Sequence, residues 1–286
     1  GWYTLSLHDA LPIYPVAPFQ AGMGGQEATN VAFETGRRLM PAGIDWDFMD
    51  FQSLARAEVR DGRLRVSGEA YRVLVLPSMQ AARWSTLQKA LEFRRGGGVV
   101  IAVGALPRAS DLAGRDDPEL DALVKDLFDA SGPGVGAVIA KPEDVPMQIE
   151  RLVGRDVQST PPVMSLHRWV GNRDVYMVMG AAKDSECLFR TQGRPELWDP
   201  WTGRARSLHV VSQTAEGTRV RMPLEEHEAQ VVVFNPGRAR IEAVAGEESF
   251  APIESVLLEG PWEFELKPTL DNRWGDFRLP IDRQTI

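Results

Sequence analysis

Two short apolar runs separated by a single helical stretch constrain the fold of this chain most strongly. Residues 71–76 and 99–103 are almost entirely apolar, which is typical of parallel strands that are buried on both faces. Between them, Ser85 and Gln88 have the spacing of a helix-initiating capping box, and the three glycines at 96–98 end that helix. A strand, a helix and a second strand in this order predict a parallel sheet covered by helices.

The same alternation of strands and helices runs through residues 14–157. The expected elements are helices over 27–40, 118–128 and 142–152, strands over 44–49 and 135–140, and a hairpin over 58–66. We therefore expect residues 14–157 to form an α/β domain with a Rossmann-like or flavodoxin-like parallel sheet.

Helical periodicity is absent from the sequence after this region. The strand-like runs there are residues 163–170, 175–180, 186–190, 206–211, 218–223 and 229–234, with turn residues between them. This pattern predicts an antiparallel β-sandwich domain over residues 158–258. Residues 259–286 are expected to be the truncated start of a further β domain.

Charge and composition exclude several classes of partner. The chain has 286 residues, with 32 Lys and Arg against 40 Asp and Glu, so its net charge is −8. Nucleic acids and anionic membranes bind mainly through positive charge, so neither is an expected partner. No apolar run approaches the ~18 residues of a membrane span. The only cysteine, Cys187, leaves no internal disulfide and no thiolate zinc site.

The two ends of the chain suggest a piece of a longer protein. The chain begins with Gly1 rather than methionine, and its first 17 residues lack the features of a signal peptide. Residues 5–13 also resemble translated sequencing-adapter read-through. We therefore expect residues 1–13 to be a non-native leader that carries no fold information.

Two candidate catalytic features occur where the strands of the α/β region are expected to end. The glycines at 22–25 could cradle a phosphate, but Glu27 stands where a dinucleotide fingerprint has its third glycine and would repel a pyrophosphate. Ser78 follows a strand and could be a nucleophile, yet a single serine after a proline is more often a cap. The sequence thus favours a loop and a structural serine.

The carboxylates and histidines give only weak indications of a catalytic or metal-binding site. Asp45 and Asp47 would share one face of a strand and could hold Ca²⁺ or act as an acid and a base, although solvated polar positions are the commoner explanation. The four histidines, at positions 8, 167, 209 and 227, do not have metal-ligand spacing. We expect no catalytic residue and no metal ligand in this chain.

Two segments that combine aromatic and short polar residues are the candidate binding sites. They span residues 195–203 and 268–278. Exposed tryptophans stack on sugar rings while Asp, Asn and Arg bond to hydroxyls. The candidate carbohydrate contacts are Trp198, Asp199, Trp201, Asp271, Asn272, Trp274 and Asp276. A tryptophan corner that packs two domains together, with its indole N–H satisfied locally, is the alternative.

These segments also carry a family resemblance. Residues 71–77, 95–100, 195–203 and 268–280 resemble the region that follows the catalytic barrel in glycoside hydrolase family 106, the α-L-rhamnosidase type. The resemblance implies a multidomain, secreted or periplasmic enzyme that removes terminal α-L-rhamnose from polysaccharides and glycosides. It also implies two catalytic carboxylic acids on an upstream (β/α)₈ barrel, inversion, and commonly a calcium ion.

Because a barrel needs ~250 residues, the resemblance assigns no catalytic residue to this chain. Three functions stay open. The chain could be a non-catalytic accessory region that buttresses the barrel in cis and contacts its rhamnose-containing substrate. It could instead be an independent carbohydrate-binding module, or a freestanding α/β hydrolase that uses Ser78 or the pair Asp45 and Asp47.

Overall fold

The protein is a mixed α/β chain whose contacts divide it into two units. In the computed structural model, unit 1 is Gly1–Val244 and unit 2 is Ala245–Ile286. The structure describes residues 4–112, 114–129, 131–180, 185–222, 229–237, 257, 259–261, 263–265 and 283–285. In unit 2, strands β19 (Glu263–Glu265) and β20 (Arg283–Thr285) pair in antiparallel fashion.

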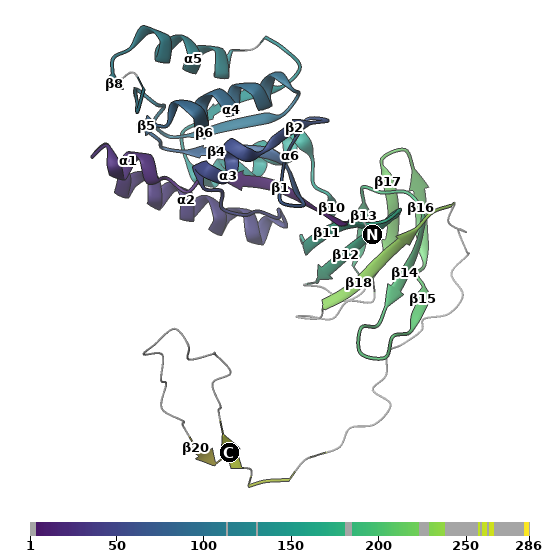
Figure 1. The fold of residues 1–286 in the computed structure, drawn as a ribbon. Helices are drawn as coiled ribbons and strands as arrows, with labels where there is room; N and C mark the ends of the chain where they lie inside the picture. Colours follow the sequence, from purple (N-terminus) through teal and green to yellow (C-terminus); the bar gives the residue numbers. More distant parts are fainter. Residues whose placement is uncertain are drawn as a thin grey trace. The chain divides into compact units, whose positions relative to one another are not determined.

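Four parallel strands form the centre of the first half of unit 1 (Figure 1). They are β1 (Thr4–Pro12), β4 (Glu69–Pro77), β6 (Val99–Val103) and β9 (Val135–Ile139), side by side in that order. The apolar run at 99–103 therefore forms the strand that the sequence predicts. The strands on either side of it, β4 and β9, were also predicted, although β9 ends one residue earlier than expected.

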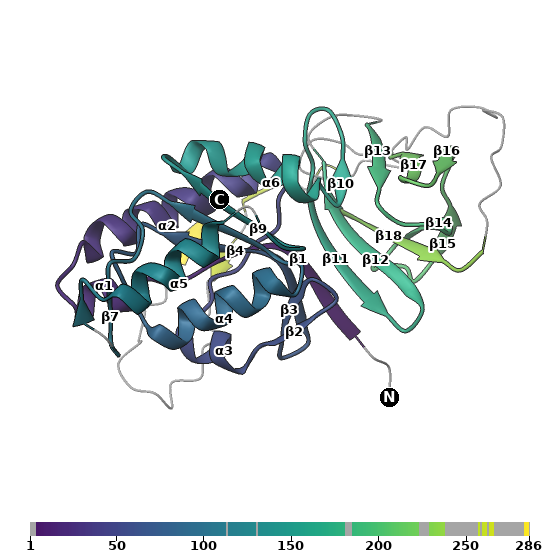
Figure 2. The same ribbon diagram turned by 90° about the horizontal axis from the view of Figure 1, so that it is seen from above.

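Helices cover both faces of these parallel strands (Figure 2). The helices α3 (Phe51–Arg56), α4 (Trp84–Arg95) and α5 (Pro118–Phe128) contribute to the core on one face. On the other face, the core contains residues of α2 (Gly25–Leu39) and α6 (Val145–Val153). The central strands β4 and β6 are thus buried on both faces, whereas β9 keeps Val135 and Val138 exposed.

Strand β4 shows why its sequence is apolar without alternation. Leu74 and Leu76 pack into the core beneath α3, α4 and α5. Val73 and Val75 point the other way, into the core beneath α2 and α6. All four are at most 1% exposed, and each such burial stabilises the fold by about 1.5–3 kcal/mol.

The N-terminal strand β1 corrects one expectation. Residues 4–12, expected to carry no fold information, form a strand that pairs with β4 in parallel and with β11 (Met164–Val170) in antiparallel fashion. Ala10 and Leu11 are fully buried in it. The expectation of a leader without fold information is therefore wrong for these residues.

Residues 44–49 run beside β1 but do not form the expected strand. They make two isolated parallel bridges, from Trp46 to Ala10 and from Met49 to Ile13. Pro12 lies between these bridges and has no N–H to donate, which interrupts the ladder there. The short 3₁₀ helix η1 (Met40–Ala42) and Gly43 lead into this segment.

The predicted hairpin is confirmed. Strands β2 (Glu58–Arg60) and β3 (Arg63–Val66) pair around Asp61 and Gly62. Both turn residues have positive φ, 53° and 68°, as a two-residue type I′ turn requires. The remaining short elements of this half are α1 (Val16–Gln20), β5 (Ala81–Ala82), β7 (Ala109–Ser110), β8 (Gly114–Arg115) and η2 (Pro142–Asp144).

Antiparallel strands make up the second half of unit 1, as the sequence predicts. Beyond β1 the large sheet continues through β11, β12 (Arg173–Met179), β18 (Ala229–Asn235), β14 (Arg194–Trp198) and β15 (Ala205–Ser207). A separate four-stranded sheet contains β10 (Val157–Gln158), β13 (Glu186–Phe189), β17 (Gly217–Arg221) and β16 (Val210–Thr214).

Side chains from both of these sheets share one core. Tyr176 and Phe234 come from the large sheet, and Cys187 and Phe189 come from the smaller one. The Tyr176 and Phe189 rings meet edge to face, with centroids 5.0 Å apart. Cys187 is buried, as expected for a strand residue, and burial raises the pKa of its thiol to about 11.

Candidate functional site

The hairpin of β14 and β15 presents two tryptophans. Trp198 is the last residue of β14 and pairs with Val231 of β18 and Ala205 of β15. Trp201 lies in the turn that follows. Its side chain is 95% exposed, whereas that of Trp198 is 37% exposed. The strand itself was not predicted from the sequence, because it contains Pro195 and a proline argues against a strand.

Asp199 fixes the turn that carries Trp201. One carboxylate oxygen accepts hydrogen bonds from the backbone N–H groups of Trp201, at 2.8 Å, and Thr202, at 3.3 Å. The other oxygen accepts from the Thr202 hydroxyl at 2.6 Å. These hydrogen bonds hold the pKa of Asp199 below its usual range, and the bond from the Thr202 hydroxyl has the largest effect. Asp199 thus orders the loop, and its contact with a sugar stays a prediction.

Trp198 has partners within the protein. Its indole Nε1 donates to Glu196 Oε2 at 3.0 Å, and the guanidinium carbon of Arg173 lies 5.7 Å from the ring centroid. This local satisfaction of the indole N–H is one element of the tryptophan-corner alternative. Trp201 therefore offers the more open aromatic surface of the two.

The other predicted contact residues fall outside the residues that the structure describes. They are Asp271, Asn272, Trp274 and Asp276. These four residues therefore stay predictions.

Ser78 is held in a structural role at the end of β4. Its side chain is fully buried and its φ is +43°. The hydroxyl donates to Glu27 Oε1 at 2.9 Å and accepts from the Ala105 N–H at 3.3 Å. The glycine stretch before Glu27 leads into α2, with Gly24 as its N-cap. Ser78 therefore ties two loops to the start of a helix and is not presented to a substrate.

Asp45 and Asp47 have different surroundings. Asp47 Oδ2 accepts a hydrogen bond from the Tyr71 hydroxyl at 3.4 Å. Burial and then the charge of Asp47 raise the pKa of that tyrosine. Asp45 instead lines a cavity beside Trp46. The charges of both carboxylates contribute to the raised pKa of Tyr71.

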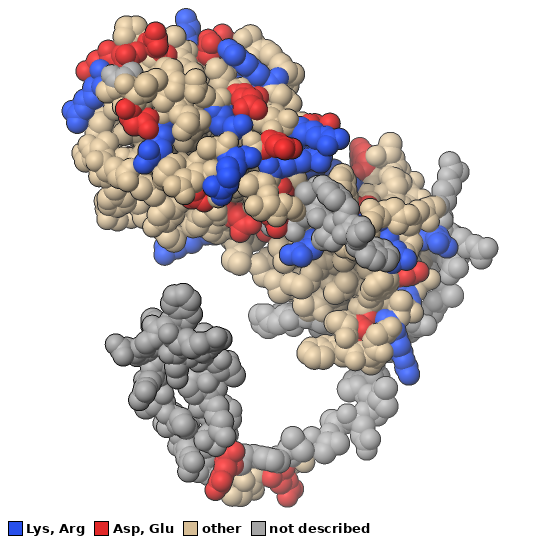
Figure 3. Space-filling model, in the orientation of Figure 1, with Lys and Arg blue, Asp and Glu red and all other residues tan. Residues whose placement is uncertain are grey.

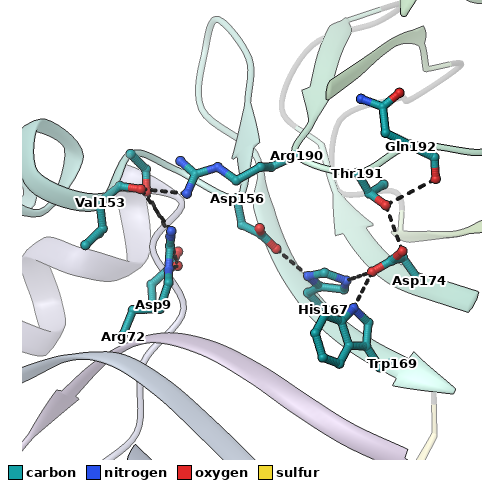
Figure 4. A network of polar contacts seen from close by, with 11 residues as sticks. Asp9, Arg72, Val153, Asp156, His167, Trp169, Asp174, Arg190, Thr191 and Gln192 are labelled. Carbon is teal, nitrogen blue, oxygen red and sulfur yellow. Dashed lines mark hydrogen bonds and ion pairs between the residues drawn. The ribbon is translucent and has the colours of Figure 1, made fainter. Parts of the chain in front are cut away.

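A buried histidine lies between two carboxylates in the second half of unit 1 (Figure 4). His167 Nδ1 lies 2.6 Å from Asp156 Oδ2, and its Nε2 lies 2.8 Å from Asp174 Oδ1. Although burial alone would lower the pKa of His167, the bonds to Asp156 and Asp174 raise it to about 9. Both ring nitrogens therefore carry protons at neutral pH.

Asp174 and Asp156 are themselves held as carboxylates. Asp174 also accepts from Trp169 Nε1, at 2.6 Å, and from the Thr191 hydroxyl, at 2.7 Å. Burial opposes ionisation at both aspartates, but the hydrogen bond to His167, the His167 charge and the other bonds and charges nearby together outweigh it and lower the pKa of each. The imidazolium is thus fully satisfied, which suits a structural ion pair rather than a general base.

Two arginines tie this region to the parallel strands (Figure 4). Arg72 of β4 pairs with Asp9 and donates to the carbonyl groups of Val153 and Gly154, both at 2.9 Å. Arg190, which follows β13, donates to the same Val153 carbonyl at 2.6 Å. The end of α6 is therefore clamped from both halves of unit 1. The spacing of these residues in the sequence does not predict the network.

Comparisons with known proteins identify the family. The family model described as α-L-rhamnosidase, glycoside hydrolase family 106, matches residues 22–212. This chain belongs to that family. The match confirms the resemblance seen in the sequence, and a search of curated proteins finds no match.

Solved structures share the fold of this rhamnosidase-family chain. A rhamnosidase from Novosphingobium sp. PP1Y is 23% identical, with a TM-score of 0.62 over 85% of this chain. The α-L-fucosidase isoenzyme 2 from Paenibacillus thiaminolyticus is 16% identical, with a TM-score of 0.51 over 82%. The β-galactosidase Gan42B from G. stearothermophilus is 10% identical, with a TM-score of 0.53 over 80% of this chain.

The chain spans only part of each of these structures. It covers 24% of the rhamnosidase, 49% of the fucosidase and 40% of the β-galactosidase. At these identities the likeness shows the fold alone. The activity of the whole protein is therefore a matter for proposal.

The resemblance to the rhamnosidase family implies a calcium ion in the whole protein. Within the part of the chain that the structure describes, no group of three or more His, Cys, Asp or Glu side chains could hold a metal ion. Ca²⁺ takes six to eight oxygen ligands, and Asp45 and Asp47 do not supply such a set together.

The surface and the helices of the described residues add two facts. Lys and Arg side chains are interspersed with Asp and Glu on the face drawn in Figure 3. Among the described residues, no helix has the length and apolar character needed to cross a membrane.

Proposed function

We propose that this chain is a non-catalytic accessory region of a glycoside hydrolase whose whole protein hydrolyses terminal α-L-rhamnosides. The observation that supports this most directly is the extent of the family match. It covers residues 22–212, which hold three of the four parallel strands and most of the antiparallel strands, while the chain spans 24% of the rhamnosidase from Novosphingobium sp. PP1Y.

The catalytic pair of carboxylic acids belongs, in this proposal, to an upstream (β/α)₈ barrel in the same polypeptide. Two features of the chain support that placement. Ser78 is fully buried, and Asp47 accepts a hydrogen bond from the Tyr71 hydroxyl. The chain's contribution is then to support the barrel and to contact the carbohydrate. A freestanding α/β hydrolase is the least supported alternative.

The finer architecture is part of the same proposal. The parallel strands with helices on both faces support a Rossmann-like domain over residues 14–157. The two antiparallel sheets with a shared core support a β-sandwich over 158–258. A further β domain would start at 259. Secretion or a periplasmic location, and any calcium site outside the described residues, follow from the family resemblance.

We propose that Trp201, rather than Trp198, makes the principal contact with carbohydrate. Its indole is almost fully exposed, and Asp199 holds the turn beneath it. A rigid aromatic surface binds the apolar face of a sugar ring at little cost in conformational entropy. Trp198 lies three residues earlier, at the end of β14, and would extend this surface.

Titration with methyl α-L-rhamnoside and with a rhamnose-containing polysaccharide tests this contact. Calorimetry is expected to show saturable binding to the wild-type chain and its loss in Trp201→Ala. Leu112→Ala is the matched control, because Leu112 is also exposed, at 68%, but lies far along the sequence from this hairpin. Equal binding by Trp201→Ala and the wild type would reject the contact.

The same titration separates the two non-catalytic functions. An independent carbohydrate-binding module, favoured by the exposure of Trp201, would bind the polysaccharide tightly without any barrel. An accessory region would bind weakly by itself, because the barrel supplies most of the sugar cleft. In either case the isolated chain is expected to hydrolyse no rhamnoside.

A further inference from the structure

Strand β9 is a free edge of the large sheet. Among the strands that the structure describes, it pairs only with β6. The Val135 N–H donates to the Gly98 carbonyl, on the side of β6, at 3.1 Å. Because successive residues of a strand direct their backbone groups to opposite sides, the N–H and C=O groups of Gly136 and Val138 point away from β6. No residue that the structure describes forms a hydrogen bond with them on that side.

This edge lacks the features that usually prevent pairing with another strand. Exposed edges are commonly guarded by charged side chains, by prolines or by very short strands. The other two edge strands of the same sheet, β2 and β15, have three residues each and carry Glu58, Arg60 and Arg206. Strand β9 has five residues, none of them charged or proline, and two of them are valines exposed by 38% and 50%. Its unpaired donors and acceptors match the backbone of an added strand.

A groove adjoins this edge on the side of helix α5. Its volume is about 440 Å³, and its lining consists of Leu106, Asp121, Val124, Lys125, Phe128 and Asp129. The groove lies next to β9 at Phe128, because the backbone of Leu127 and Phe128 packs so closely on Gly136 that a Cβ there has no room. A side chain that an added strand places opposite Gly136, on this face, would therefore lie beside the groove.

We propose that β9 pairs with β9 of a second copy of this chain, in antiparallel fashion about a two-fold axis at Ala137. In this register Gly136 of each copy lies opposite Val138 of the other, and each such pair exchanges two backbone hydrogen bonds. The outward groups of both residues are then satisfied in both copies. The two-fold symmetry makes the two contacts identical, as in most dimers.

The side chains of β9 favour its own copy as the partner. Gly136 and Val138 are two residues apart, so they share one face of the strand, the face covered by α5. Each Val138 thus stands opposite a residue without a side chain, beside the apolar Val124 and Phe128 of the second copy's groove. The exposed valine and the groove that would cover it therefore occur on the same strand edge.

The charges at the two ends of β9 are also complementary. Asp129, which lines the groove, precedes the strand, and Lys141 follows it. Antiparallel pairing brings the end of one strand beside the start of the other, so Lys141 of each copy approaches the Asp129 end of the other. Opposite charges that meet in this way favour one orientation of the two partners.

Sedimentation velocity of the full chain tests the dimer, at concentrations from about 1 μM to about 1 mM because the paired edge is short. The wild type is expected to show a reversible equilibrium between monomer and dimer. Val138→Lys should raise the dissociation constant at least about tenfold, since a lysine guards an edge strand. Met147→Lys is the control with the same change of charge, because Met147 is 67% exposed on α6, and it should leave the constant unchanged. A wild type that stays monomeric throughout would overturn the proposal.

Val138→Pro tests the backbone pairing separately from the side chain. It keeps an apolar side chain and removes only the N–H that points away from β6, a position that tolerates proline in an edge strand. It should also raise the dissociation constant about tenfold, because each copy loses one donor to the other. Circular dichroism establishes which variants are folded, and amide exchange of the wild type needs no variant.

Amide hydrogen exchange locates the interface in the wild type. The Gly136 and Val138 N–H groups should exchange more slowly as the concentration rises and the dimer forms, whereas the Ala137 N–H, which faces β6, should not change. A dimer in which these two amides exchange as in the monomer would contradict the proposal. So would a dimer that Leu166→Lys dissociates and Val138→Lys does not, since Leu166 is exposed, at 40%, on β11.

Discussion

Raising the pH from about 6 to about 10 is expected to remove the stabilisation that the His167 imidazolium provides. Both ring nitrogens of His167 lie against carboxylates, at 2.6 Å from Asp156 and 2.8 Å from Asp174. The folded protein therefore binds the histidine proton more tightly than the unfolded chain does. That contribution is fully present below a pH near 6.5, the ordinary pKa, and is lost as the pH rises through about 9.

The size of the effect follows from the shift. The pKa of His167 rises from 6.5 to about 9, and each unit of difference is worth about 1.4 kcal/mol. Ionisation of His167 therefore stabilises the folded state by about 3 kcal/mol. The side chain is only 6% exposed, so solvent screening reduces this value little.

Urea unfolding of the wild type and of His167→Gln at a series of pH values measures the contribution. Between about pH 6 and about pH 9.5 the wild type should lose about 3 kcal/mol in the free energy of unfolding relative to the variant. The variant should also be less stable than the wild type at neutral pH, because Asp156 and Asp174 lose a charged partner. His209→Gln, as a control, should keep the wild-type dependence on pH.

One result would refute this reasoning. If the wild type and His167→Gln lose stability in parallel across the range, the titrating group is not His167. Direct NMR titration of the His167 ring gives a second readout, and a pKa near 6.5 would show that the carboxylates do not hold its proton.

Three further substitutions test the fold. Asp111→Ala should cost about 1 kcal/mol, because Asp111 Oδ1 accepts from the first N–H of α4, at Trp84, over 2.8 Å; an unchanged urea midpoint would contradict this. Leu74→Ala should cost about 2–5 kcal/mol since Leu74 is fully buried, whereas exposed Leu112→Ala should change stability by less than about 0.5 kcal/mol; equal effects would show that the core is misassigned. Gly62→Ala should cost about 1–2 kcal/mol because its φ is +68°, and thermal unfolding that is unaffected would argue against the type I′ turn.

Local sequence signals predicted the elements that local chemistry determines. The run at 99–103 is apolar throughout and forms β6 as predicted. The helix α5 begins at Pro118, which suits a first turn, and ends at Phe128 as expected. The turn at Asp61 and Gly62 has the residues that its positive φ values require.

Long-range contacts decided what the sequence could not show. The spacing of Ser85 and Gln88 predicts a helix that begins at Thr86 with Ser85 as its cap, but α4 begins at Trp84 with Arg83 as its N-cap. The carboxylate that accepts from the first N–H of this helix belongs to Asp111, 27 residues away. A capping partner at that distance leaves no local pattern in the sequence.

The candidate site was predictable in composition and not in geometry. The sequence singles out Trp198 and Trp201, but their different exposures depend on the pairing of β14 with β18. The network around His167 was missed, because its two carboxylates come from a loop and a neighbouring strand. The partners of a histidine in a strand can be identified only once the order of the strands is known.

Hydrolysis of an aryl α-L-rhamnoside by the purified chain tests the proposed function most directly. The rhamnosidase from Novosphingobium sp. PP1Y would be the active reference under the same conditions. The account predicts no release of the aryl group above the buffer rate, even at high concentrations of the chain. Release that scales with the chain's concentration, and that is abolished by Ser78→Ala or Asp45→Asn, would show that the chain is itself the catalyst and contradict the account.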